Sequence, residues 1–214
     1  MSDTHGSSSF SFPIPDGDIF IHAGDLTRAS SFVEFKETIN WIKELPHKLK
    51  IVTAGNHDHV LDEQFGFIQE KQYVLSLFEQ AGIIYLEHEP FVLPEKFGGY
   101  KTFVSPYAPI HCGGAFMPND LTPYWEQIPL DTQILVTHTP PRGYNDKIRR
   151  GGLHVGCPVL REKVDTIKPL VHIFGHIHEG HGWSKSDDKK TVFVNACTCN
   201  HRYRPNQRPW VFDL

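Results

Sequence analysis

Five short polar clusters, in a fixed order between Asp3 and His178, constrain this sequence of 214 residues more than any other feature. Besides His57 and Asp58, they supply two carboxylates, one amide oxygen and four imidazoles, which are side chains that hold divalent metal ions. They lie far apart along the chain, so only a folded domain can bring them together. The clusters are Asp3-Thr4-His5, Gly24-Asp25, Gly55-Asn56-His57-Asp58, Thr137-His138 and Gly175-His176-Ile177-His178.

Length and composition are typical of a globular protein with a single domain spanning residues 1–214. The 21 basic and 25 acidic side chains give a net charge of −4, which argues against binding of nucleic-acid polymers. No apolar run approaches the roughly 18 to 20 residues of a membrane helix, and the first residues lack a signal-peptide pattern. We therefore expect a cytoplasmic protein that does not bind membranes. The four cysteines lack Cys-x-x-Cys spacing and are interpreted as free, mostly buried thiols, and the oligomeric state is not indicated.

Apolar runs with strand character alternate with helical periodicity, which predicts an α/β fold class. Ser31 and Glu34 have the spacing of a capping box and begin a predicted helix that extends to Leu45. Four of the five clusters directly follow a predicted strand, and in α/β sheets ligands bind beyond the carboxyl ends of the strands. The predicted strands are 19–22, 50–54, 83–86, 100–104, 134–137, 171–174, 191–195 and 209–212, with further helices at 69–81 and 158–167 and a polar hairpin turn at 184–190.

Two of the clusters contain pairs of ligand-type residues at alternate positions, Asp3 with His5 and His176 with His178. In an extended segment such residues point to the same side, so each pair can bind on one face. A set of nitrogen and oxygen ligands without thiolates suits manganese, iron, zinc or cobalt better than calcium. Two such ions about 3.5–4 Å apart would hold a phosphoryl group and activate a water molecule. We expect two divalent metal ions, with manganese favoured and iron, zinc or magnesium as alternatives.

His57 and Asp58 are the predicted catalytic pair. His57 is free to donate a proton to a leaving oxygen, and Asp58 could accept a hydrogen bond from His57 and keep it protonated. Arg142 and Asn145, in the loop after His138, are candidate contacts to a substrate phosphate or base. His59 and His181 lie near the clusters and could line a pocket. The remaining histidines are expected to be packed or solvated, namely His22, His47, His88, His111, His154, His172 and His201.

The ordered set D-x-H, GD, GNHD, H and GHxH resembles the pattern of the calcineurin-like metallophosphoesterase superfamily. Stretches around residues 19–26, 41–57, 134–143, 171–182 and 195–214 look closest to the small metallophosphoesterase-domain-containing proteins of animals and fungi. The resemblance covers nearly the whole chain and implies a four-layer α+β fold, a two-sheet β sandwich flanked by helices. It implies a first metal held by Asp3, His5, Asp25 and His178, and a second held by Asp25, Asn56, His138 and His176. Asp25 would bridge the two ions, and His57 would be the catalytic histidine.

The chain departs from this pattern at its beginning. In the family, Asp-x-His ends a central strand of about five to seven residues, but only Met1 and Ser2 precede Asp3 here. The first central strand is therefore missing or truncated, unless the sheet is completed in another way. Asp3 and His5 are expected to lie on a frayed terminus. We accordingly expect the first metal to bind more weakly than the second.

The resemblance implies a phosphoesterase that hydrolyses phosphodiesters of small substrates such as nucleotides, with phosphomonoesters as a second substrate class. Two alternatives remain open from the sequence. One is a protein Ser/Thr phosphatase. The other is a binding or scaffold module that keeps the fold but has low activity, which the truncated strand favours and the intact His57, His138 and His176 disfavour.

Overall fold

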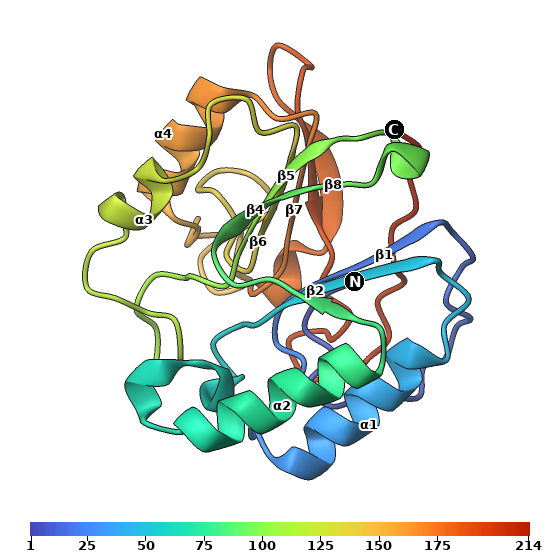
Figure 1. Cartoon of the computed structure of the whole chain (residues 1–214). Helices are drawn as coiled ribbons and strands as arrows, with labels where there is room; N and C mark the ends of the chain where they lie inside the picture. The colour runs from blue at the N-terminus through green and yellow to red at the C-terminus, as the bar shows by residue number, and fades with distance from the viewer.

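Two β-sheets lie face to face between two pairs of helices in the computed structural model, which describes residues 1–214 (Figure 1). The first sheet is parallel and has the order β1-β2-β3. The second sheet is mixed and has the order β4-β5-β6-β7-β9-β8. The strands are β1 (Ile19–Ala23), β2 (Leu49–Thr53), β3 (Ile84–Tyr85), β4 (Glu89–Val92), β5 (Lys101–Ser105), β6 (Ile134–Thr137), β7 (Val171–Phe174), β8 (Gly182–Lys185) and β9 (Val192–Asn195).

Helices α1 (Phe32–Lys43) and α2 (Ile68–Gln80) cover the outer side of the first sheet, and α3 (Thr122–Glu126) and α4 (Pro158–Ile167) cover the outer side of the second (Figure 1). Short 3₁₀ turns occur at His59–Leu61, Glu63–Phe65, Glu95–Phe97 and His178–Gly180. The four layers confirm the fold class that the resemblance implies. None of the helices is both long and apolar enough to cross a membrane.

Side-chain alternation along the strands divides the interior into layers. In β6, Ile134 and Val136 point into the core between the sheets, whereas Leu135 packs against α3 and α4. Val194 and Phe193 of β9 divide in the same way. Because successive residues of a strand face opposite sides, a second-sheet strand that is apolar on both faces must lie between two cores. This explains why all four residues of β6 and all four of β7 are buried, with only Thr137 and His172 polar among them.

Most predicted elements form. Ser31 accepts a hydrogen bond from the Glu34 amide while the Glu34 side chain binds the Ser31 amide, so the capping box at the start of α1 is confirmed. Three elements have no counterpart among the predictions, namely β4, β8 and α3. The predicted strand at 209–212 is wrong, because this segment contains no β-pairing. The turn at 184–190 is confirmed by the antiparallel pairing of β8 with β9.

The residues before the Asp-x-His cluster form a short, firmly held segment instead of a full strand. The Ala23 amide donates to the carbonyl of Met1, and the Asp3 amide donates to the carbonyl of Gly24. On the other side, Ser2 forms a parallel bridge to Cys197. Residues 1–5 are all buried, so the expectation of a frayed terminus is wrong. Hydrogen bonds on both edges replace the support that a longer strand would give.

Candidate metal centre

Four parallel strands end at the site. Asp25 follows β1, Asn56 and His57 follow β2, His138 follows β6, and His176 follows β7. Parallel strands place their carboxyl ends at the same edge, and here two sheets bring their edges together. The Asp3 cluster joins them because its backbone pairs alongside the end of β1. All five polar clusters therefore meet in one place.

The backbone is strained at four of the residues that the sequence assigns to metal binding. Asp3, His5, Asp25 and His176 all have positive φ angles, of 53°, 47°, 54° and 66°. Side chains other than glycine rarely adopt this conformation, and such strain concentrates at functional sites. The surrounding structure must hold these residues in place, which favours a functional role for their side chains.

Glycines allow the clusters to approach one another closely. A Cβ atom added at Gly175 would overlap the carboxylate of Asp3 and the side chain of Ser2. A Cβ atom at Gly55 would overlap Asp25, and its distance to the His138 ring would be only 2.6 Å. The glycines of the GNHD and GHxH motifs thus make room for the ligand-type side chains of other clusters.

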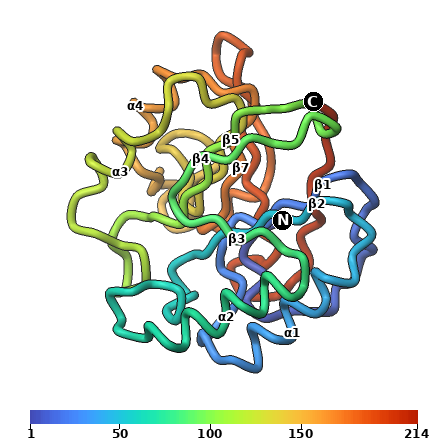
Figure 2. Tube along the Cα trace, in the orientation of Figure 1, coloured from blue at the N-terminus to red at the C-terminus, as the bar shows by residue number.

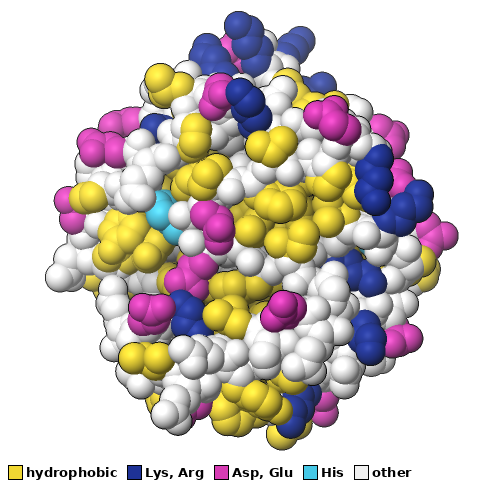
Figure 3. Space-filling view, viewed as in Figure 1, with side chains coloured by type: hydrophobic (Ala, Val, Ile, Leu, Met, Phe, Trp, Pro, Cys, Tyr) yellow, Lys and Arg dark blue, Asp and Glu magenta, His cyan; other side chains and the backbone are white.

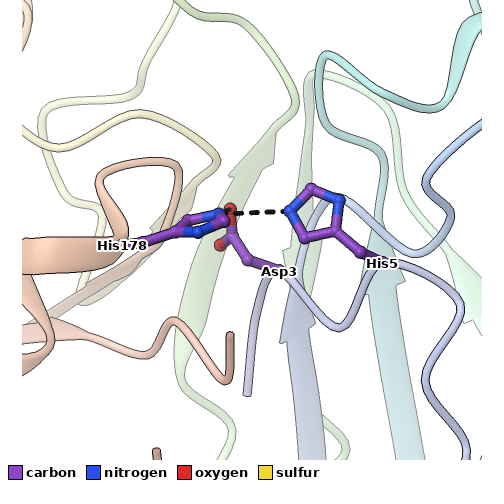
Figure 4. A group of neighbouring side chains, drawn as sticks. All are labelled: Asp3, His5 and His178. Atoms are coloured by element: carbon purple, nitrogen blue, oxygen red, sulfur yellow. Dashed lines mark hydrogen bonds and ion pairs between the residues drawn. The ribbon is translucent and has the colours of Figure 1, made fainter. Parts of the chain in front are cut away.

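Asp3, His5 and His178 form the first group (Figure 4). The Nε2 atoms of His5 and His178 are 3.1 Å apart, and His178 Nε2 lies 3.3 Å from Asp3 Oδ1. Asp25 Oδ2 is 3.7 Å from His5 Nε2, so this carboxylate borders the group. The backbone carbonyl of Asn200 lies 3.0 Å from Nδ1 of His178 and orients its ring.

Asp25, His138 and His176 form the second group. His138 Nδ1 lies 3.0 Å from the carbonyl oxygen of Ala23, which requires the proton on Nδ1. The unprotonated Nε2 then faces Asn56 Oδ1 at 3.0 Å and Asp25 Oδ1 at 3.5 Å. Three atoms with lone pairs converge here, an arrangement that fits a bound cation. Asp25 touches both groups, one with each oxygen.

Charges in this buried site are poorly compensated without a cation. Burial and the neighbouring carboxylate of Asp3 raise the pKa of Asp25 well above its usual value. Burial lowers the pKa of His5 to about 3 and that of His176 well below its usual value, so both rings are neutral and able to bind a metal. His178 differs, because burial is outweighed by the hydrogen bond and charge attraction to Asp3 together with the hydrogen bond to the Asn200 carbonyl, and its pKa rises to about 9. At Asp3, burial is outweighed by the hydrogen bond to His178 together with attraction to the surrounding imidazoles, and its pKa is lowered well below its usual value.

A cleft of about 430 Å³ opens above the two groups. Asp25, Asn56, His57, His176 and His178 form its polar floor. Its walls combine aliphatic side chains with imidazole, phenol and carboxylate groups, and they include residues that the sequence did not single out for the site: Ile110, His111, Ile148, Val155, Glu179, His201 and Tyr203. A ligand here would meet the metal groups on one side and a wall of mixed character on the other.

His57 and Asp58 are not arranged as expected. The Asp58 carboxylate accepts hydrogen bonds from the amides of Leu26, Thr27 and Gly55 and does not contact the His57 ring. Adjacent residues in the turn point in different directions, and Asp58 is needed to satisfy buried amides. The expectation that Asp58 accepts a hydrogen bond from the His57 ring is therefore wrong. The His57 ring instead places Nδ1 2.9 Å from the carbonyl oxygen of Arg28 and borders the cleft.

The two candidate substrate contacts lie outside the cleft lining. Asn145 uses its amide group to bind the carbonyl of Gly180 and the hydroxyl of Ser184. Arg142 is exposed, and its backbone pairs with Cys157. Nor do His59 and His181 line the cleft.

Tyr203 is a site residue that sequence reasoning missed. Its ring centroid lies 4.8 Å from that of His5 and 5.2 Å from that of His178, and the Arg28 guanidinium stacks on it at 5.1 Å. Tyr203 also has a positive φ angle, of 56°. The only available signal was its place in a polar, arginine-rich stretch close to the end of the chain.

Comparisons with known proteins agree with this geometry. The family model described as calcineurin-like phosphoesterase matches residues 2–180. Human metallophosphoesterase domain-containing protein 1 is 34% identical over all of this chain, which spans 69% of that protein. A probable rhamnogalacturonate lyase C of Emericella nidulans is 42% identical over 85% of this chain, which spans only 17% of that protein. The structure of a phosphopantetheinyl hydrolase from Mycobacterium tuberculosis is similar in fold, with a TM-score of 0.67, 16% identity, and coverage of 100% of this chain and 95% of that one. The chain therefore belongs to the calcineurin-like phosphoesterase family.

Proposed function

We propose that the protein hydrolyses phosphodiesters of small substrates such as nucleotides, with phosphomonoesters as a second class, and that two divalent metal ions serve the reaction. The observation that carries the proposal is the position of Asp25. One of its oxygens faces the first group and the other faces the second, directly beside His57. A carboxylate that faces two ligand groups at once could bind both of two closely spaced metal ions.

The proposed ligands divide as the family pattern implies. Asp3, His5, Asp25 and His178 would hold one ion, and Asp25, Asn56, His138 and His176 the other. Bound there, the ions would supply positive charge to the phosphoryl group and lower the pKa of a water molecule. Manganese is the favoured metal, because the donor set combines imidazoles with carboxylate and amide oxygens.

His57 would act as the general acid. The contact between its Nδ1 and the Arg28 carbonyl places a proton on Nδ1, so the ring would donate from Nε2 as the imidazolium, which carries a second proton on that atom. The Nε2 proton would pass to the leaving oxygen and leave the ring neutral, or would donate a hydrogen bond to the phosphoryl oxygen on which charge develops. Asp58 would act indirectly, by holding the turn that carries His57 against Leu26 and Thr27.

The cleft supports a small substrate. Its volume of about 430 Å³ falls within the range of small-molecule sites, roughly 300–1,000 Å³. The apolar wall formed by Ile110, Ile148 and Val155 would accept a planar or aliphatic group attached to the phosphate. Contacts from Arg142 and Asn145 to the substrate would require a rearrangement of their loop.

The test is hydrolysis of bis-p-nitrophenyl phosphate and p-nitrophenyl phosphate by metal-free protein to which Mn²⁺ is added. We expect activity that depends on the metal, with the diester preferred. Asp25→Asn should remove metal binding and activity, whereas His57→Ala should remove activity alone. Folded protein that binds metal but hydrolyses neither ester would favour the binding module. Hydrolysis of the monoester and of a phosphoserine peptide, without the diester, would favour a protein phosphatase.

A further inference from the structure

Two segments of the chain carry basic side chains and no acidic ones. They are residues 147–153 and 199–208, and together they hold six of the 21 basic side chains and none of the 25 acidic ones. On the face of the molecule shown in Figure 3, by contrast, lysines and arginines are scattered among aspartates and glutamates. A local excess of positive charge attracts anionic ligands even where the net charge of the chain is −4. We call five of these side chains the basic rim: Lys147, Arg149, Arg150, Arg202 and Arg204.

The first segment is the tip of a hairpin with a fixed base. Lys147 and His154 form an antiparallel bridge across it. At the base, the buried carboxylate of Asp146 accepts hydrogen bonds from the amides of Gly143 and Gly156, at 3.0 and 2.9 Å, and pairs with the His154 ring. The charge of Asp146 is thus compensated inside the hairpin, and it does not neutralise the cations at the tip.

The second segment forms a turn beside the first metal group. The Asn200 side-chain oxygen accepts from the Arg202 amide at 2.8 Å, and the Asn200 amide donates to the Arg204 carbonyl at 2.9 Å. The carbonyl of the same Asn200 orients the His178 ring. This part of the chain follows the segment that pairs with the N-terminus, so the red and blue parts of the trace lie side by side (Figure 2).

The two segments meet at the mouth of the metal cleft. Arg149 Nη1 lies 3.2 Å from Nε2 of His201, which joins the hairpin tip to the turn. Ile148 from the hairpin, and His201 and Tyr203 from the turn, line the cleft. The five cations themselves are exposed beside these lining residues. None of them pairs with a carboxylate, and Arg161 is the only arginine that does.

We propose that the basic rim binds a second phosphate of the substrate, distinct from the phosphate that the metal centre holds. This inference rests on the proposed function, because it takes the metal centre as the place of the first phosphate. Exposed guanidinium groups without acidic partners suit this role, since arginine binds phosphate bidentately. The substrate class is therefore a small organic molecule that carries phosphate groups at two separate positions.

A small molecule fits better than a nucleic-acid polymer. The basic rim borders a single cleft of about 430 Å³ whose floor is the metal centre. A polymer would need a longer basic track, whereas the face in Figure 3 mixes both signs of charge. Glu179 also lines the cleft, and its carboxylate would repel a long polyanion that crosses the lining.

The experiment compares two ligands that resist hydrolysis, because a carbon–phosphorus bond replaces the ester. They are p-xylylenebisphosphonate and p-methylbenzylphosphonate, which share a ring and differ by one anionic group. Calorimetry on the Mn²⁺-loaded protein should show about tenfold tighter binding of the bisphosphonate, well beyond the twofold that two equivalent ends give. The preference should shrink between about 50 and about 300 mM NaCl, because exposed charges are screened. Equal affinity for the two ligands overturns the proposal, whatever the variants show.

A matched pair of variants locates the second subsite. Arg149→Gln with Arg150→Gln should remove the preference for the bisphosphonate while thermal unfolding stays unchanged. Lys189→Gln with Lys190→Gln is the control, because it removes two adjacent exposed charges from the turn before β9, at the opposite end of that strand from the metal centre. An equal loss in both variants, or no loss in either, contradicts a site at the basic rim.

Two further results separate this inference from its alternatives. Hydrolysis of bis-p-nitrophenyl phosphate tests the proposed function on the same protein sample, because that ester has no second phosphate. Normal hydrolysis without a preference for the bisphosphonate overturns the second subsite alone, whereas a preference without hydrolysis overturns the catalytic proposal alone. Oligothymidylates whose affinity rises with length and falls in the arginine variant, without a bisphosphonate preference, would assign the basic rim to nucleic acid and overturn the inference.

Discussion

His57 is oriented by the main chain of Arg28, whose carbonyl oxygen lies 2.9 Å from Nδ1 of the ring, and no carboxylate is hydrogen-bonded to that ring. A carbonyl fixes the tautomer and direction of an imidazole without adding a negative charge. The imidazole therefore keeps Nε2 available in the cleft. The side chain of Arg28 is not needed for this orientation.

The first prediction concerns this pair. His57→Asn should lower kcat for bis-p-nitrophenyl phosphate by about 10²–10⁴-fold, the usual contribution of a general acid, while metal content stays unchanged. Arg28→Ala is the matched control, because it keeps the carbonyl and should retain most of kcat. Steady-state kinetics and elemental analysis test both. A large loss in Arg28→Ala with normal His57→Asn activity would contradict the assignment.

The second prediction concerns pH and the first metal. The pKa of His178 is raised to about 9, so at neutral pH a metal must displace a proton from its ring. Apparent affinity at this site should rise by up to about tenfold per pH unit below pH 9. The first metal is thus still expected to bind more weakly than the second at pH 7, although not because of fraying. Titrations with Mn²⁺ at pH 6.5, 7.5 and 8.5 test this, and equal pH dependence of both sites would refute it.

The third prediction is acid sensitivity from His172. Its ring is buried in β7, and burial lowers its pKa to about 3. The unfolded chain takes up this proton below pH 6.5 and the folded chain does not, so stability falls as the pH falls from 6.5 toward 3. The loss from this residue is about 2 kcal/mol at pH 5. His172→Gln, which can still donate to Thr137, should reduce the pH dependence of urea denaturation between pH 6.5 and 5. An unchanged slope would exclude His172 as its source.

The fourth prediction concerns the close approach at Gly175. Gly175→Ala places a methyl group against the Asp3 carboxylate and Ser2. Overpacking of this kind costs about 1–3 kcal/mol and should displace Asp3 from the first metal. Gly17→Ala is the control, because its Cβ would meet only ordinary contacts to His47. Thermal unfolding and metal content test the pair, and we expect loss of one metal per chain in Gly175→Ala only.

Elements that are set by residues close together in the chain could be predicted from the sequence. The capping box of Ser31 and Glu34 and the strand-type residues of β6 and β7 can be recognised from neighbours in the chain, and the structure contains both features. The clustering of ligand-type residues could also be expected, because motifs that end parallel strands share one edge.

Contacts between residues that lie far apart in the sequence could not be predicted from it. Tyr203 reaches His5 only because of a left-handed turn at the end of the chain, and its local sequence carries no such signal. Asp58 follows His57 directly, yet it serves the amides of Leu26 and Thr27, more than thirty residues earlier. The segment 209–212 has strand-type residues, but it makes no backbone hydrogen bond to any strand. In each case a tertiary neighbour decides the outcome.

The positive φ angles at Asp3, His5, Asp25 and His176 have a consequence for evolution and engineering. Each is stored strain of about 1–3 kcal/mol that glycine would relieve. Metal-free variants with glycine at one of these positions are therefore expected to tolerate more heat than the parent protein and to lose catalysis. Selection for thermal tolerance alone would replace these four residues. If a lineage keeps them, selection has acted on the chemistry of the metal centre.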